Sequence, residues 1–258
     1  MKLRFLTLFL LGLFLGSCAS REKLAYYQNI ENLDKAADNY QLTLKSDDLL
    51  LIIVSSPVPE AALDFNLATY GIVGTGLGGT PDAAGAQLLH QTYLIDRDGM
   101  IQFPVLGPIK MGGKTREAAI EDLKKQLVAH IKEPIVNMRV LNYKVSVQGE
   151  VLRPGTFTIT TERVTLPEVL TMAGDLTIYA KRDNILVIRE IDGKKTHNFV
   201  DITQANFMNS PFYYMSQNDL VYVEPNKTKM NSAVVGPNIS IALSALSLLI
   251  TVVALLIR

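Results

Sequence analysis

The chain contains few residues whose type and spacing could support cofactor binding. Residues 74–79 satisfy the G-x-G-x-x-G pattern, which holds a dinucleotide only when its last glycine opens a helix. Residues 80–85 contain a proline and a further glycine, so no helix of useful length can begin there. Residues 113–115 are similar to the end of a phosphate-binding loop, but Pro108 stands where that motif needs its first glycine. We therefore predict no nucleotide site and no cofactor.

The sequence also contains few motifs that would support nucleophilic or metal-assisted catalysis. The sequence has no G-x-S-x-G and no H-E-x-x-H motif, and His90, His130 and His197 are isolated from one another. A single cysteine excludes a disulfide within the chain and any metal site built from two or four cysteines. We expect no metal, no catalytic residue and no enzyme. A glycosidase-like carboxylate pair stays open as an alternative, because such pairs are recognised by their separation in space.

The composition limits the class of protein further. Of 258 residues, 48% are hydrophobic and 19% are charged, and the mean hydropathy of +0.19 is high for a soluble enzyme. Lys+Arg and Asp+Glu both number 25, so the basic excess that would hold nucleic-acid phosphates is missing. The chain is also too apolar for a disordered protein. We predict a folded protein without a nucleic-acid partner.

The only cysteine, Cys18, lies at the end of a targeting signal. Lys2 and Arg4 give the signal a positive start, and residues 6–15 form an apolar run of signal-peptide length. Leu-Gly-Ser-Cys at residues 15–18 matches the lipobox of bacterial lipoproteins, in which the cysteine takes a diacylglyceryl group. We expect residues 1–17 to be removed and Cys18 to be lipidated. An ordinary secretory signal with an incidental cysteine is the alternative.

The residue after the cysteine bears on localisation. Ala19 stands where an aspartate often retains lipoproteins at the inner membrane. We therefore expect an outer-membrane, lipid-anchored protein with most of the chain in the periplasm, beginning with a polar tether at residues 18–37.

The other end of the chain is uncharged from Met230 to Ile257. Residues 239–257 are nearly all Ile, Leu, Val and Ala, and at ~1.5 Å per residue they span about 28 Å, close to the hydrocarbon thickness of a bilayer. The sequence therefore predicts a transmembrane helix at residues 237–258, after a linker at residues 227–236.

Polar residues of this predicted helix recur at steps of three, four or seven and share one face. They are Ser240, Ser244, Ser247, Thr251 and Arg258. Such a stripe in a membrane helix packs against copies of itself or faces water inside a ring of helices. The alternative is a lone anchor whose serines bond to their own helix. Because a lipidated protein hardly needs a second anchor, we favour the ring, with these residues lining its lumen.

Between the targeting signal and the C-terminal apolar segment, the sequence predicts short strands and two helices. Thr115 can cap the first helix, and Thr165 and Glu168 form a capping box for the second. Asp192-Gly193 predicts a hairpin. The glycine-rich residues 71–85 predict an irregular insertion of unassigned role. Strands are expected at residues 41–44, 49–54, 143–147, 185–190, 195–200 and 220–224, of which the second is an apolar run expected to be buried on both faces. The predicted fold class is α+β, in two small modules.

The order of several motifs resembles the outer-membrane polysaccharide export proteins of the Wza type. The motifs are Asp-Gly-Met-Ile at residues 98–101, the helix after Thr115, Gly-Glu-Val with Arg-Pro-Gly at residues 149–155, and Asp-Leu-Val-Tyr-Val at residues 219–223. The resemblance covers roughly residues 40–225. It implies a polysaccharide export domain at residues 38–142 and one soluble ligand-binding β-grasp (SLBB) domain at residues 143–226. Lys-Ser-Asp-Asp at residues 45–48 departs from the usual Gly-Pro-Gly-Asp.

The same resemblance implies a function. In this family, lipidated subunits assemble as rings, and polysaccharide passes through the middle. It implies a homo-oligomeric ring that contacts membrane lipid and conducts capsular or extracellular polysaccharide across the outer membrane. An inner-membrane polysaccharide co-polymerase would be its partner. The alternative function is a doubly anchored periplasmic glycan-binding scaffold without a pore.

Overall fold

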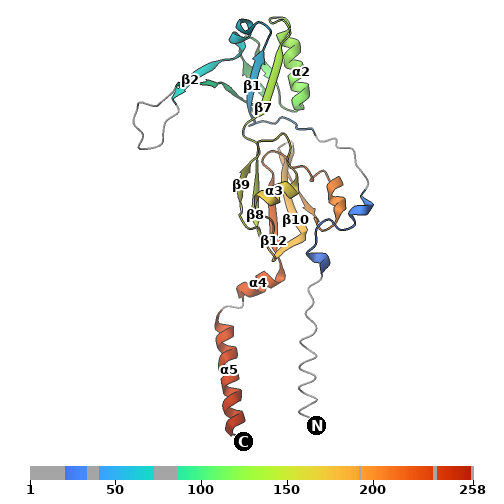
Figure 1. Ribbon diagram of the computed structural model, residues 1–258, viewed down its shortest axis with the longest axis vertical. Helices are drawn as coiled ribbons and strands as arrows, with labels where there is room; N and C mark the ends of the chain where they lie inside the picture. Colours follow the sequence, from blue (N-terminus) through green and yellow to red (C-terminus); the bar gives the residue numbers. More distant parts are fainter. Residues whose placement is uncertain (1–20, 34–40, 73–85, 192, 235–236, 257–258) are drawn as a thin grey trace.

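The computed structural model describes residues 21–33, 41–72, 86–191, 193–234 and 237–256. Buried hydrophobic side chains form one cluster within residues 44–138 and a second within residues 143–223. Each cluster belongs to its own β-sheet domain, and the second domain lies between the first domain and the two C-terminal helices (Figure 1).

The first domain is built around strand β1 (Leu49–Ser55). This strand pairs antiparallel with β4 (Thr92–Leu94) on one side and β7 (Ile135–Val140) on the other. Helix α2 (Arg116–Leu127) begins after Thr115, whose side chain accepts a hydrogen bond from the Ala118 amide, as predicted. Two further pairs of strands complete the domain: β2 (Ala68–Ile72) with β3 (Ala86–His90), and β5 (Met100–Phe103) with β6 (Gly107–Lys110).

Three expectations for this domain were wrong. Residues 49–54 form a strand, but its burial alternates: Leu50, Ile52 and Val54 are buried, whereas the residues between them are half-buried. The apolar run therefore turns only one face fully to the core. Residues 41–44 form no strand, because Thr43 makes only an isolated bridge to Thr115 beside the start of α2. Gly71 and Ile72, expected in the irregular insertion, instead end strand β2. Residues 73–85, which carry the G-x-G-x-x-G pattern, lie outside those described.

The second domain is a five-stranded sheet in the order β11-β10-β12-β8-β9. Strands β12 and β8 are parallel, and the other pairs are antiparallel. The bounds are β8 (Lys144–Gly149), β9 (Gly155–Thr158), β10 (Ala180–Ile191), β11 (Lys194–Val200) and β12 (Leu220–Pro225). The β10–β11 pairing confirms the predicted hairpin.

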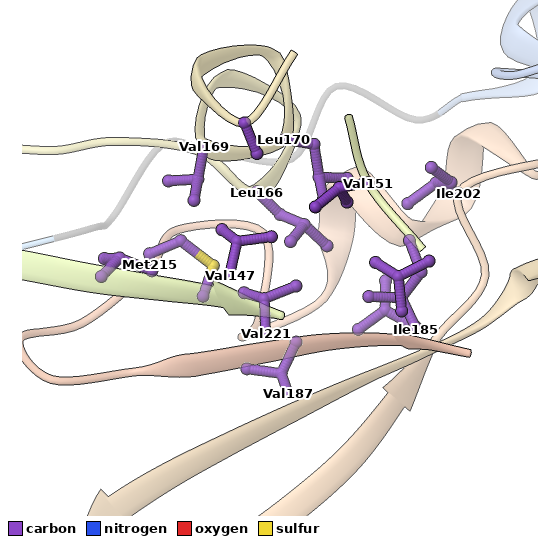
Figure 2. Packing of buried hydrophobic residues seen from close by; sticks show 14 of the residues in the cluster. Val147, Val151, Leu166, Val169, Leu170, Ile185, Val187, Ile202, Met215 and Val221 are labelled. Atoms are coloured by element: carbon purple, nitrogen blue, oxygen red, sulfur yellow. The ribbon is translucent and has the colours of Figure 1, made fainter. Parts of the chain in front are cut away.

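Helix α3 (Leu166–Met172) covers one face of this sheet. Figure 2 shows Leu166, Val169 and Leu170 of the helix above Val147 and Val221 of the parallel strands. The predicted capping box is confirmed, because the Glu168 carboxylate accepts a hydrogen bond from the Thr165 amide at 2.7 Å and the Thr165 hydroxyl accepts one from the Glu168 amide at 3.3 Å.

The predicted transmembrane helix at residues 237–258 was wrong. The chain does form α4 (Lys227–Val234) and α5 (Pro237–Leu256), but among the described residues no helix has the length and apolarity needed to cross a membrane. The prediction had relied on the apolar run at residues 239–257 and on its calculated span of about 28 Å. The fold class is therefore mixed α and β without the membrane helix.

Candidate functional site

The structure places only some of the predicted site residues. Cys18 and Arg258 lie outside the described residues, and Ser240 is in the first turn of α5. Ser244, Ser247 and Thr251 are exposed and share one face of α5. Within the part of the chain that the structure describes, no group of His, Cys, Asp or Glu side chains could hold a metal ion.

Two hydroxyls of α5, those of Ser247 and Thr251, bond within their own helix. The Ser247 hydroxyl donates to the Ser244 carbonyl oxygen, and the Thr251 hydroxyl donates to the Ser247 carbonyl oxygen, both at 2.8 Å. This is the local bonding that we considered as the alternative to a lumen. The hydroxyl oxygens keep lone pairs that can accept further hydrogen bonds.

The apolar residues of α5 are exposed around the helix. They are Ile241, Leu243, Leu246, Leu248, Leu249, Ile250, Val252, Val253 and Leu255, each between 44% and 70% exposed. A contiguous apolar surface of this kind marks a site of interaction with other molecules. This makes α5 a candidate association surface.

The two domains are joined at Asn142. Its side chain accepts a hydrogen bond from the Leu49 amide at 2.9 Å and donates one to the Asp47 carbonyl at 2.8 Å, both in the first domain. Its own carbonyl accepts from the Gln217 side chain of the second domain at 2.8 Å. Gln217 also accepts from the Lys144 amide at 2.8 Å. These two amide side chains fix how the domains meet.

A polar cleft of about 860 Å³ opens at this junction. Cationic side chains line it beside anionic ones, and four glycines also line it. The charged lining residues include Lys45, Arg97, Lys110, Asp47, Asp98 and Glu190. No aromatic residue is among the described residues that line it. The cleft can therefore exchange hydrogen bonds with a hydroxyl-rich molecule, but it offers no ring for stacking.

Asp48 is a buried carboxyl group at the same junction. It is only 1% exposed, and its Oδ2 accepts a hydrogen bond from the Lys45 amide at 2.9 Å. Its Oδ1 has no hydrogen-bond partner. Burial raises the pKa of Asp48 to about 6, and the Lys45 amide only partly offsets this. The folded state thus holds this proton more tightly than the unfolded state.

We expect Asp48→Asn to change how stability depends on pH. Because the folded pKa is raised, the wild-type protein loses stability as pH rises between about 4 and 6, by about 3 kcal/mol in total. The variant lacks this titration, so it should be more stable than the wild type at neutral pH, with little difference near pH 4. Urea unfolding at a series of pH values measures this, and a stability difference that stays constant with pH would contradict it.

The N-terminal segment at residues 21–33 packs on the second domain, although the first domain follows it in sequence. The amide of Tyr27 donates to the Ile202 carbonyl at 3.2 Å, and the Gln28 amide donates to the Thr203 carbonyl at 2.7 Å. The Tyr27 ring stacks on Phe207 with 6.0 Å between centroids. We call residues 21–33 the N-terminal clasp.

A second aromatic residue of the N-terminal clasp makes a polar contact. The Tyr26 hydroxyl donates to Asp175 Oδ1 at 3.0 Å, and the Arg182 guanidinium lies 5.5 Å from the Tyr26 ring. Burial raises the pKa of Tyr26 to about 12. The sequence alone did not predict that the N-terminal clasp packs on the second domain. The only sign of it in the sequence is the pair of adjacent tyrosines in an otherwise polar segment.

Comparison with known proteins gives two adjacent matches. The sequence model of the family described as polysaccharide biosynthesis/export protein matches residues 36–141, and the SLBB domain model matches residues 143–223. The chain is 36% identical over 136 residues to the EPS I polysaccharide export outer membrane protein EpsA of Ralstonia nicotianae, covering 50% of this chain and 33% of that protein. The protein of the same name from Ralstonia solanacearum is 29% identical over 187 residues, covering 70% of this chain and 47% of that protein. The chain thus spans a third to about half of the length of these relatives.

Proposed function

Because the chain belongs to the polysaccharide biosynthesis/export protein family, we propose that it takes part in moving a capsular or extracellular polysaccharide across the outer membrane. The observation that carries this proposal is the export domain followed directly by an SLBB domain, over residues 36–223. Proteins of this family are transport proteins and not enzymes. The role proposed here is passive conduction, with the driving force supplied by other components.

We propose further that several copies assemble as a closed ring around the polymer. The exposed apolar surface of α5 supports this, since a monomer would leave it in contact with water. Identical copies can cover such surfaces by repeating one contact around a rotation axis. An inner-membrane polysaccharide co-polymerase is the proposed partner that delivers the polymer to the ring.

The chemistry proposed for polymer contact is hydrogen bonding without tight binding. The cleft at the domain junction combines charged side chains with exposed backbone, and sugar hydroxyls can both donate to and accept from these groups. The lack of an aromatic ring among its described lining residues suits a polymer that has to keep moving. The lining of the cleft thus favours a path along which polysaccharide moves over a site that retains it.

Lipid attachment at Cys18 is the proposed means of holding the protein at the outer membrane, with most of the chain in the periplasm. We expect Cys18→Ala to lose the diacylglyceryl group and to lower surface polysaccharide to about the level of cells that lack the protein. Ser20→Ala, two residues away, is the matched control and should support normal export. Mass spectrometry of the N-terminal peptide and staining of surface polysaccharide measure the two effects. Normal export by an unlipidated Cys18→Ala protein would contradict the proposal.

A further inference from the structure

Three exposed apolar side chains gather at one end of the SLBB domain. Leu152 is 69% exposed, Ile178 is 60% exposed and Tyr179 is 40% exposed. We call them the SLBB tip. Their loops lie side by side, because the Leu152 amide donates to the Asp175 carbonyl at 3.1 Å and the Thr177 amide donates to the Glu150 carbonyl at 3.3 Å. The tip is therefore one surface formed by two loops.

The sheet topology places this tip where the chain leaves the domain. Strands β8 and β12 are parallel, so their C-terminal ends meet at the same edge of the sheet. The loop with Leu152 follows β8, and α4 follows β12. The Asn226 amide donates to the Tyr179 carbonyl at 2.7 Å, which joins the start of α4 to the tip. Figure 1 shows α4 and α5 at this end, opposite to the first domain.

The N-terminal clasp leads to the same end. Tyr26 is hydrogen-bonded to Asp175, which is in one of the two tip loops. Cys18 precedes Tyr26 by eight residues, which span at most about 28 Å when fully extended. A lipid on Cys18 would therefore keep the SLBB tip within about that distance of the membrane that holds the lipid.

The chemistry of the tip suits a lipid surface. Two aliphatic side chains and a tyrosine are exposed together, and the Lys229 ammonium lies 5.2 Å from the Tyr179 ring. Arg153 is exposed beside Leu152. Tyrosine and long basic side chains are enriched where a protein meets lipid headgroups, because their apolar parts enter the interface while their polar ends stay hydrated.

We propose that the SLBB tip rests in the interfacial layer of the leaflet that anchors Cys18, with Leu152, Ile178 and Tyr179 in contact with lipid. This inference rests on the proposed lipid attachment. It orients the protein with its SLBB domain against the membrane and its export domain away from it. The lipid and the tip would then act as two contacts that set the tilt of each subunit.

A tryptophan reporter tests this directly, because the chain contains no tryptophan. Ile178→Trp places the only indole in the tip, and Leu152→Trp is a second reporter in case the first variant misfolds. The matched control is Val128→Trp. Val128 is 64% exposed and directly follows α2 in the first domain. The full lipidated proteins are reconstituted in vesicles of phosphatidylethanolamine and phosphatidylglycerol, with or without brominated acyl chains.

We expect the tryptophan at position 178 to emit at shorter wavelength in vesicles and to lose emission with brominated lipid, while the control at position 128 does neither. A blue shift without loss of emission would show that another copy of the chain covers the tip, and would overturn the inference. Unchanged emission would overturn it as well. If mass spectrometry shows Cys18 without its lipid, the proposed attachment fails too, whereas a lipidated protein without quenching overturns only this inference.

Discussion

Replacing Gly149 by alanine is expected to unfold the SLBB domain or leave it only marginally stable. Gly149 ends β8 with a φ of +93°, and a Cβ atom there would lie 2.0 Å from the Val223 carbonyl oxygen and 2.9 Å from its carbon. That oxygen accepts the Glu150 amide at 2.9 Å, so moving it away would break the link between β8 and β12. We expect a loss of about 3–5 kcal/mol in the free energy of unfolding, measured by urea denaturation.

Gly193→Ala is the matched control for this substitution. Gly193 also has a positive φ, +73°, but no atom lies within 4 Å of its added Cβ. The backbone strain alone should cost about 1 kcal/mol. If the two variants lose equal stability, the close approach of Val223 does not explain the need for glycine at position 149.

Asp219→Ala should be nearly as damaging, because it leaves a buried guanidinium without its counter-ion. Asp219 is fully buried and Arg189 is 9% exposed. The Arg189 side chain donates to both carboxylate oxygens, at 3.0 Å to Oδ1 and 2.7 Å to Oδ2, and to the carbonyls of Pro211 and Tyr214. Removing one partner of a buried pair costs about 3–5 kcal/mol, measurable as a lower midpoint of urea unfolding.

A second ion pair in the same domain serves as the control. Lys181 and Glu224 are 2.6 Å apart, but about a third of each side chain is exposed. Water already screens this pair, so Glu224→Ala should lower the free energy of unfolding by about 0–1 kcal/mol. If Glu224→Ala were as damaging as Asp219→Ala, burial would not be the reason that the Arg189–Asp219 pair matters.

Features with local causes could be predicted from the sequence. The caps at Thr115 and Thr165 and the hairpin before Lys194 depend on residues a few positions apart, and the structure confirms them. The resemblance to the export family could be recognised because several motifs occur in the family's order along the chain. The matches at residues 36–141 and 143–223 confirm it.

Features with distant causes could not be predicted. The Asn142–Gln217 contact joins residues 75 positions apart, and the Tyr26–Asp175 contact joins residues 149 apart. No periodic pattern marks such pairs in a single sequence. The membrane helix predicted for the C-terminal segment is a different failure, because an apolar run of sufficient calculated length was taken as enough to predict that it crosses a membrane. The assignment of its hydroxyls to a shared lumen stays a prediction, and those of Ser247 and Thr251 also donate to carbonyl oxygens of their own helix.

The central claim is that copies of this chain enclose a path for polysaccharide. Electron-microscopy images of the full-length, lipidated protein extracted in mild detergent test it most directly. We predict closed rings with a central opening, whose domains stack in the order export domain, SLBB domain and C-terminal helices. Monomers or dimers without an enclosed opening would contradict the conduit and would favour a membrane-attached glycan-binding scaffold.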